Sequence, residues 1–447
     1  MPENKEPNSQ NEFMIEKIKE RPINQKKLVK RTLITVAMAV IFGLVACFTF
    51  LALEPVLNNW MNPKTELPKI YFPEEQEEMS PEDMLSENIS ETLEEDSSQN
   101  VEEYFTELQQ EEIEQIVGRI RLRLPNYREL YSALAEYSKI LQKSVVTLTG
   151  IQSHVDWLND VNESENRSSG VIIANNTREL LILTDYTPLQ KAERILVTFC
   201  NGAETTAELK NIDPTTNLAV VALPVEALPD NFIGNEISIA TQGSTNQSNL
   251  EGTPVIALGN PMGSVRSVGY GVITGTSGQV IETDVNYKLL QTDIIGSPKA
   301  DGVIFNLYGQ VLGIITNSHN MQGMENLIMA YGITDLKKRM EKLSNDQPFA
   351  YAGINGMSIS LSVHEDMGIP YGAYVREVIM DSPAMRAGIR QGDIIVLMEG
   401  KEIKDYSDYT AVMAQQSPEK TVSLKIMRQY QNAYKEMDLE MTLEKLE

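Results

Sequence analysis

A series of short apolar segments with the two-residue period of β-strands begins at Ser144 and continues to about residue 340. Examples are V-V-T-L-T, L-L-I-L-T and L-A-V-V-A-L, and turns rich in Gly, Asn and Asp separate them. Many short strands joined by such turns are typical of an all-β barrel or sandwich. The sequence therefore predicts a mainly β domain over residues 144–342, which the helical segment L-K-K-R-M-E-K-L closes.

An uncharged apolar run at residues 33–53 predicts one transmembrane helix over residues 32–54. Its length suits a hydrocarbon core of about 30 Å. Lys and Arg residues precede it, whereas Glu54 follows it, so the positive flank predicts a cytoplasmic tail at residues 1–31 and an extracytoplasmic remainder. A cleaved signal peptide is the alternative, but the apolar run is longer than the hydrophobic region of most signal peptides.

The next part of the chain is predicted to be a linker followed by helices. Residues 55–100 contain several prolines and a dense run of Glu and Asp, with no Lys or Arg after Lys69. Such a segment buries too little apolar surface to offset its ordering entropy, so we expect an acidic, disordered linker. Residues 101–143 have helical apolar spacing, and Pro125 is expected to divide two helices. A coiled coil and packing on the following domain both remain open.

Composition excludes several classes of function. The net charge of −25 argues against nucleic-acid binding, which needs clustered Lys and Arg. The two cysteines, Cys47 and Cys200, stand in an apolar run and a polar turn, so they predict neither a disulfide framework nor a cysteine metal site. The three histidines are too widely spread to form a cluster. The sequence predicts no metal and no cofactor.

Several motifs resemble, in the same order, those of the trypsin-like proteases of the HtrA/DegP family. They are S-G-V-I-I at 169–173, L-T-D-Y at 183–186, D-P-T-T-N-L-A-V at 213–220, G-N-P-M-G at 259–263 and the long stretch at 290–314. Each motif alone is weak, but the ordered set is specific. The resemblance implies a trypsin-like double β-barrel.

The same resemblance implies that all three positions of the catalytic triad are substituted. Carried over position by position, the histidine becomes Thr187, the aspartate becomes Asn217 and the serine becomes Asp301. The segment is one residue short, and another placement of the gap puts Ala300 at the serine position. Lys299 replaces a glycine of the oxyanion loop. Because the triad needs a base, an orienting carboxylate and a nucleophilic hydroxyl, the sequence predicts that no catalytic site is intact.

A second resemblance, over residues 348–445, is to the PDZ domains of HtrA-type proteins. The matching motifs are Y-A-G-I at 351–354, G-A-Y-V at 372–375, S-P-A at 382–384 and G-D-I-I at 392–395. A PDZ domain takes a peptide C-terminus as an added strand, and backbone N–H groups hold the carboxylate. The resemblance therefore implies a peptide-binding loop at Tyr351, Ala352, Gly353 and Ile354, with the last three supplying N–H groups.

Together these observations predict a mainly β protein: a trypsin-like double β-barrel and a PDZ domain, preceded by one transmembrane helix and an acidic linker. We expect a membrane-anchored, catalytically inactive HtrA-like protein that binds peptide C-termini or unfolded protein segments outside the cytoplasm. The family resemblance also implies a homo- or hetero-trimer. Two alternatives remain: an active HtrA-like serine endopeptidase in envelope protein quality control, and a structural or oligomerisation module.

Overall fold

The computed structural model describes residue 38 and residues 68–72, 124–155, 161–247, 249–316, 326–431 and 433–446. Residues 68–447 form one compact unit. Within the described ranges, no helix combines the length and the apolar character that crossing a bilayer requires. All but one residue of the predicted transmembrane helix, and most of the predicted acidic linker, lie outside the described residues, so both stay predictions.

The first barrel consists of six antiparallel strands. They are β1 (Val145–Val155), β2 (Val161–Asn175), β3 (Glu179–Asp185), β4 (Arg194–Thr198), β5 (Glu204–Asp213) and β6 (Leu218–Pro224). The sheet closes in the order β1-β2-β3-β6-β5-β4. Both faces of β3 and β6 are buried, as expected of their continuous runs of Leu, Ile and Val. Short helical turns lie at Gln142–Ser144, Thr187–Leu189, Val225–Ala227 and Phe232–Asn235.

The second barrel follows and has the same number of strands. They are β8 (Pro254–Asn260), β9 (Ser267–Glu282), β10 (Val285–Ile295), β11 (Asp301–Asn306), β12 (Gln310–Thr316) and β13 (Leu327–Gly332). The order is β11-β8-β9-β10-β13-β12, and pairing of β12 with β11 closes the barrel. The short strand β7 (Thr241–Gln242) pairs with β12 from outside. The predicted double β-barrel is confirmed.

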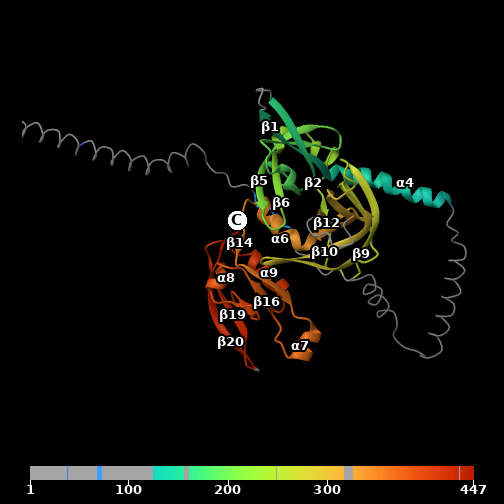
Figure 1. Cartoon of the computed structure of the whole chain (residues 1–447). Helices are drawn as coiled ribbons and strands as arrows, with labels where there is room; N and C mark the ends of the chain where they lie inside the picture. Colours follow the sequence, from blue (N-terminus) through green and yellow to red (C-terminus); the bar gives the residue numbers. More distant parts are fainter. Residues whose placement is uncertain are drawn as a thin grey trace, which may run out of the picture. The chain divides into compact units, whose positions relative to one another are not determined.

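Two helices flank the barrels (Figure 1). The helix α4 (Leu124–Leu141) has Pro125 in its first turn, where proline is tolerated, and what precedes it lies outside the described residues. Its Leu134, Tyr137 and Leu141 pack against an apolar cluster that both barrels contribute to, so this helix packs on the domain. The helix α6 (Ile333–Ser344) buries one apolar face against both barrels and leads into the last domain.

The last domain is a second β-structure with three short helices. Its elements are β14 (Ala350–Tyr351), β15 (Ile354–Ser358), α7 (Leu361–Met367), β16 (Ala373–Val378), α8 (Pro383–Arg386), β17 (Ile394–Met398), β18 (Lys401–Glu402), α9 (Tyr406–Ala414), β19 (Thr421–Tyr430), β20 (Ala433–Thr442) and β21 (Glu444–Lys445). The main sheet has the order β15-β16-β17-β19-β20, so β15 is an edge strand. This arrangement confirms the predicted PDZ fold.

Candidate functional site

Two of the three predicted triad positions lie together at the end of β3. Asp185 accepts hydrogen bonds from the backbone N–H and the hydroxyl of Thr187, both at 2.8 Å, and from the side-chain amide of Asn217 at 3.0 Å. The same amide also donates to the Thr187 hydroxyl. Thr187 and Asn217, at the predicted histidine and aspartate positions, are thus hydrogen-bonded to each other, and neither side chain is a base near neutral pH.

Asp185 is a residue that sequence reasoning missed. It occupies the third position of L-T-D-Y, where the related motif has asparagine, so the signal was present in the printed sequence. Its carboxylate satisfies both substituted positions through hydrogen bonds. The three side chains thus form one connected hydrogen-bond network at the predicted histidine and aspartate positions.

The third triad position, Asp301, lies at the start of β11 and is only 7% exposed. Its carboxylate accepts the backbone N–H of Ser169 in the first barrel at 3.0 Å, and the side-chain amide of Asn260 lies at 3.5 Å. Burial raises the pKa of the Asp301 carboxyl, although these hydrogen bonds act in the opposite direction. The side chain therefore links the two barrels through a hydrogen bond.

The loop before Asp301 uses its backbone donors internally. The N–H of Ala300 donates to the carbonyl oxygen of Ser297 at 2.9 Å, and the N–H of Lys299 donates to the Ser297 hydroxyl at 3.1 Å. An oxyanion hole needs preorganised N–H groups that point at the reacting oxygen. In this loop the two donors preceding the nucleophile position are already satisfied, which sequence comparison alone did not reveal.

The predicted peptide-binding loop holds a carboxylate. Ala352 and Gly353 donate their N–H groups to Oδ2 of Asp284 at 2.7 and 2.9 Å, and Ile354 donates to Oδ1 at 3.0 Å. Gly353 has a φ of 88°, and a Cβ there would lie 2.2 Å from that of Ser382, so the loop requires glycine. Sequence analysis identified these donors but not their acceptor.

Tyr351, the first residue of the predicted loop, has a different environment. It belongs to β14 and pairs with Glu444 of β21, which anchors the start of the loop to the end of the domain. Ser382 caps the short helix α8 directly behind the loop, since its hydroxyl accepts the N–H of Met385 at 3.2 Å. Tyr351 therefore contributes to the shape of the loop, whereas the next three residues supply the hydrogen-bond donors.

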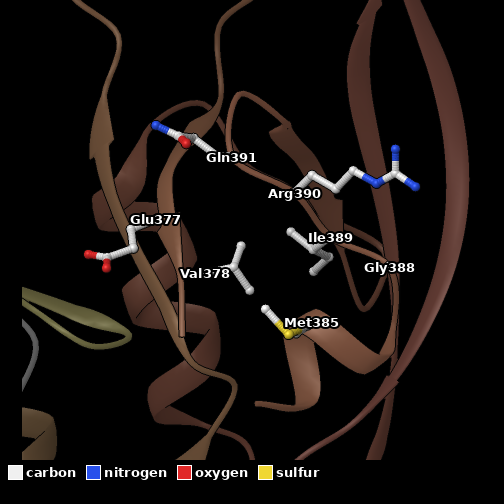
Figure 2. A pocket seen from close by; sticks show the side chains of 7 residues that line it. All are labelled: Glu377, Val378, Met385, Gly388, Ile389, Arg390 and Gln391. Atoms are coloured by element: carbon white, nitrogen blue, oxygen red, sulfur yellow. The ribbon is translucent and has the colours of Figure 1, made fainter. Parts of the chain in front are cut away.

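A separate pocket of about 400 Å³ lies on the PDZ domain (Figure 2). Its lining consists of Glu377, Val378, Met385, Gly388, Ile389, Arg390 and Gln391. The apolar side chains of Val378, Met385 and Ile389 point toward one another across it, while the carboxylate of Glu377 points away. None of these seven residues is among those that hold Asp284. In the described part of the chain, no group of three His, Cys, Asp or Glu residues is arranged to hold a metal ion.

Comparison with known families and proteins agrees with this architecture. Residues 168–314 match the trypsin-like peptidase domain, and residues 355–443 match the PDZ domain. A probable periplasmic serine endoprotease DegP-like of Chlamydia trachomatis is 28% identical over 63% of this chain and 55% of its own length. The serine protease Do-like HtrB of Bacillus subtilis is 30% identical over 55% of this chain and 56% of its own length.

Solved structures give the same fold. The structure described as HtrA-type protease AlgW with decapeptide has a TM-score of 0.50 at 21% sequence identity, over 70% of this chain and 98% of that one. The present chain spans only about half the length of the curated relatives it matches. The chain is similar to HtrA/DegP proteins along part of their length, and it contains a segment that matches the trypsin-like peptidase domain, followed by one that matches the PDZ domain.

Proposed function

We propose that this chain is a catalytically inactive HtrA/DegP-like protein whose PDZ domain binds the C-termini of peptides or exposed protein segments. The observation that carries this proposal is the convergence of three backbone N–H groups, from Ala352, Gly353 and Ile354, on a single carboxylate. Backbone N–H groups arranged in this way can capture the C-terminal carboxylate of a peptide. The AlgW structure with a decapeptide supports peptide binding as the role of the corresponding fold.

The loss of catalysis is proposed from the chemistry of the triad positions. Thr187 and Asn217 are neutral and hydrogen-bonded to Asp185, and Asp301 is buried at the barrel junction. A carboxylate at the nucleophile position also places negative charge where an oxyanion would have to form. Resemblance of fold does not by itself establish activity, so the endopeptidase alternative rests on the fold alone.

Location and assembly are also proposals. The Chlamydia trachomatis relative is described as periplasmic, and we propose that the barrels and the PDZ domain of this chain likewise lie outside the cytoplasm. The apolar segment at residues 32–54 would anchor them as a single-pass membrane protein. A homo- or hetero-trimer, with a role in envelope protein quality control, follows from the same resemblance.

Selection from a random library of peptides with free C-termini tests the proposed binding on the full chain. We expect binders whose affinity is lost when the terminal carboxylate is converted to a carboxamide. Gly353→Ala should abolish binding, because its Cβ would clash with Ser382. Gly388→Ala is the matched control, since Gly388 has nearly the same φ of 87° but open space around it. Equal binding of acid and amide peptides would refute the proposal.

A further inference from the structure

The carboxylate in the peptide-binding loop belongs to the same chain. Asp284 is the second residue of the two-residue turn between β9 and β10 in the second barrel. It adopts a left-handed backbone with a φ of 63°, which directs its side chain into the PDZ loop, and it is 6% exposed. The strands β9 and β10 reach toward α9 in Figure 1, where this turn meets the PDZ domain.

Asp284 reproduces more than the carboxylate of a peptide. Its backbone N–H donates to the carbonyl oxygen of Ile354 at 2.8 Å, and the side-chain amide of Asn286 donates to the carbonyl oxygen of Gly356 at 3.1 Å. Both acceptors lie on β15, the edge strand that a bound peptide would extend. The turn therefore occupies the hydrogen-bonding edge of the PDZ sheet together with its carboxylate loop.

The helix α9 closes the other side of this site. Tyr409 donates its hydroxyl to Oδ1 of Asp284 at 2.9 Å, and Tyr406 donates its hydroxyl to the carbonyl oxygen of Ile354 at 2.9 Å. Both tyrosines are fully buried. The Asp284 side chain is thus enclosed between the loop, β15 and α9, with a hydrogen-bond donor at each contact.

We propose that the β9–β10 turn is an internal ligand of the PDZ domain, so that a peptide C-terminus binds only after its carboxylate displaces that of Asp284. This inference rests on the proposed peptide-binding function and specifies what the ligand must do. The competent ligand is a free chain terminus, because it presents the same carboxylate and can also pair along β15. A segment without a free carboxylate has nothing with which to replace Asp284.

The balance of forces at Asp284 makes displacement possible. Burial raises the pKa of the Asp284 carboxyl, and the hydrogen bonds from Gly353, Ala352, Ile354 and Tyr409 oppose that shift without cancelling it. Holding the charged carboxylate in the closed site therefore has an electrostatic cost. Leaving the site returns Asp284 to water, while the incoming terminus takes over its hydrogen-bond donors.

The test compares the full native chain with Asp284→Gly and Asp284→Asn. Glycine removes the carboxylate and suits the left-handed backbone, while asparagine keeps the shape without the charge and tolerates that backbone. Asp346→Gly is the matched control, because Asp346 is an exposed aspartate with a φ of 51°. The probe is the tightest free-acid peptide selected on the Asp284→Gly chain, labelled with fluorescein at its N-terminus.

Fluorescence anisotropy should give an apparent affinity at least about tenfold tighter for Asp284→Gly than for the native chain. If the open, binding-competent state of the native chain is populated at about 0.1–10%, the apparent dissociation constant is the intrinsic one divided by that fraction. The apparent affinity of Asp284→Asn should lie between those of the native chain and Asp284→Gly, and that of Asp346→Gly should equal that of the native chain. Equal affinity of the native chain and both Asp284 variants would overturn the inference.

Hydrogen exchange separates failure of this inference from failure of the proposed function. In the native chain the N–H groups of Ala352, Gly353 and Ile354 should be protected, and in both Asp284 variants they should exchange at least about tenfold faster. Unchanged protection would overturn the internal ligand. Faster exchange in a chain for which the library yields no binder would instead support the internal ligand and reject peptide binding.

Discussion

The buried ion pair between Arg339 and Asp213 allows us to predict the loss in free energy of unfolding when the pair is broken. Nη1 of Arg339, on α6, lies 2.5 Å from Oδ1 of Asp213, at the end of β5. The Arg339 side chain is 13% exposed and that of Asp213 is fully buried. Asp213 also accepts the N–H of Thr215 and the hydroxyl of Thr216, so it shapes the turn that presents Asn217.

The perturbation is Arg339→Met, which keeps an apolar stem but removes the charged guanidinium that lies over the Phe349 ring. Breaking a buried pair by removing one partner leaves an uncompensated charge and costs about 3–5 kcal/mol. The bonds from Thr215 and Thr216 offset only part of that cost, so we expect a loss of at least about 3 kcal/mol. In the double variant with Asp213→Asn the buried charge is absent, and we expect a smaller loss than in Arg339→Met alone.

Urea unfolding followed by far-UV circular dichroism measures this effect as a shift in midpoint at constant slope. The matched control is Arg167→Met. Arg167 pairs with Glu165 at 3.0 Å, but these side chains are 56% and 49% exposed. Exposed pairs contribute at most about 1 kcal/mol. A loss for Arg339→Met as small as that for Arg167→Met would refute the reasoning that burial sets the energy of this pair.

Three further predictions concern the backbone, pH and catalysis. Gly302→Ala should lower the free energy of unfolding by at least about 3 kcal/mol in the same assay. Gly302 has a φ of 124°, and a Cβ there would lie 2.1 Å from the Leu258 carbonyl oxygen. An unchanged urea midpoint would contradict this prediction. Burial lowers the pKa of Lys342 to about 8, below its unfolded value, so the unfolded chain binds more protons between the two values. The free energy of unfolding of the native chain, measured relative to that of Lys342→Met, should therefore rise by up to about 3 kcal/mol as pH increases from about 8 to 10.5. A difference between the two chains that does not change with pH would refute this prediction. The triple variant Thr187→His, Asn217→Asp and Asp301→Ser restores the triad residues together. It should show no measurable peptidase activity against labelled casein, because the N–H groups of Lys299 and Ala300 still donate their hydrogen bonds to Ser297 in the same loop.

Sequence patterns predicted the fold of the described residues well, for identifiable reasons. The alternating and fully apolar segments determined the strands, and the ordered motifs determined their arrangement into two barrels. The resemblance also placed Thr187 and Asn217 at neighbouring positions, and the structure joins them by a hydrogen bond. The donors of the peptide-binding loop were predicted from the resemblance of Y-A-G-I at 351–354 to the carboxylate-binding loop of HtrA-type PDZ domains.

The contacts that Asp284 and Asp301 make between distant parts of the chain were not predictable from sequence patterns. Asp284 lies 68 residues before Ala352, in a turn whose local sequence, E-T-D-V, is ordinary for a hairpin. Its role depends on how a barrel turn meets a different domain, and no periodic pattern encodes such a contact. Likewise, the family resemblance predicted Asp301 at the nucleophile position, whereas its hydrogen bond to Ser169 across the barrel junction required coordinates.

The most direct test of the central claim is cleavage of unfolded casein by the purified full chain beside an Asp301→Ala variant. New peptide N-termini would be counted by mass spectrometry over a long incubation. We predict none above the level of the variant, together with retained binding of free-acid peptides by the native chain. Cleavage by the native chain that disappears in Asp301→Ala would mean that Asp301 is catalytic, and it would contradict the account of an inactive protease fold that acts through its PDZ domain.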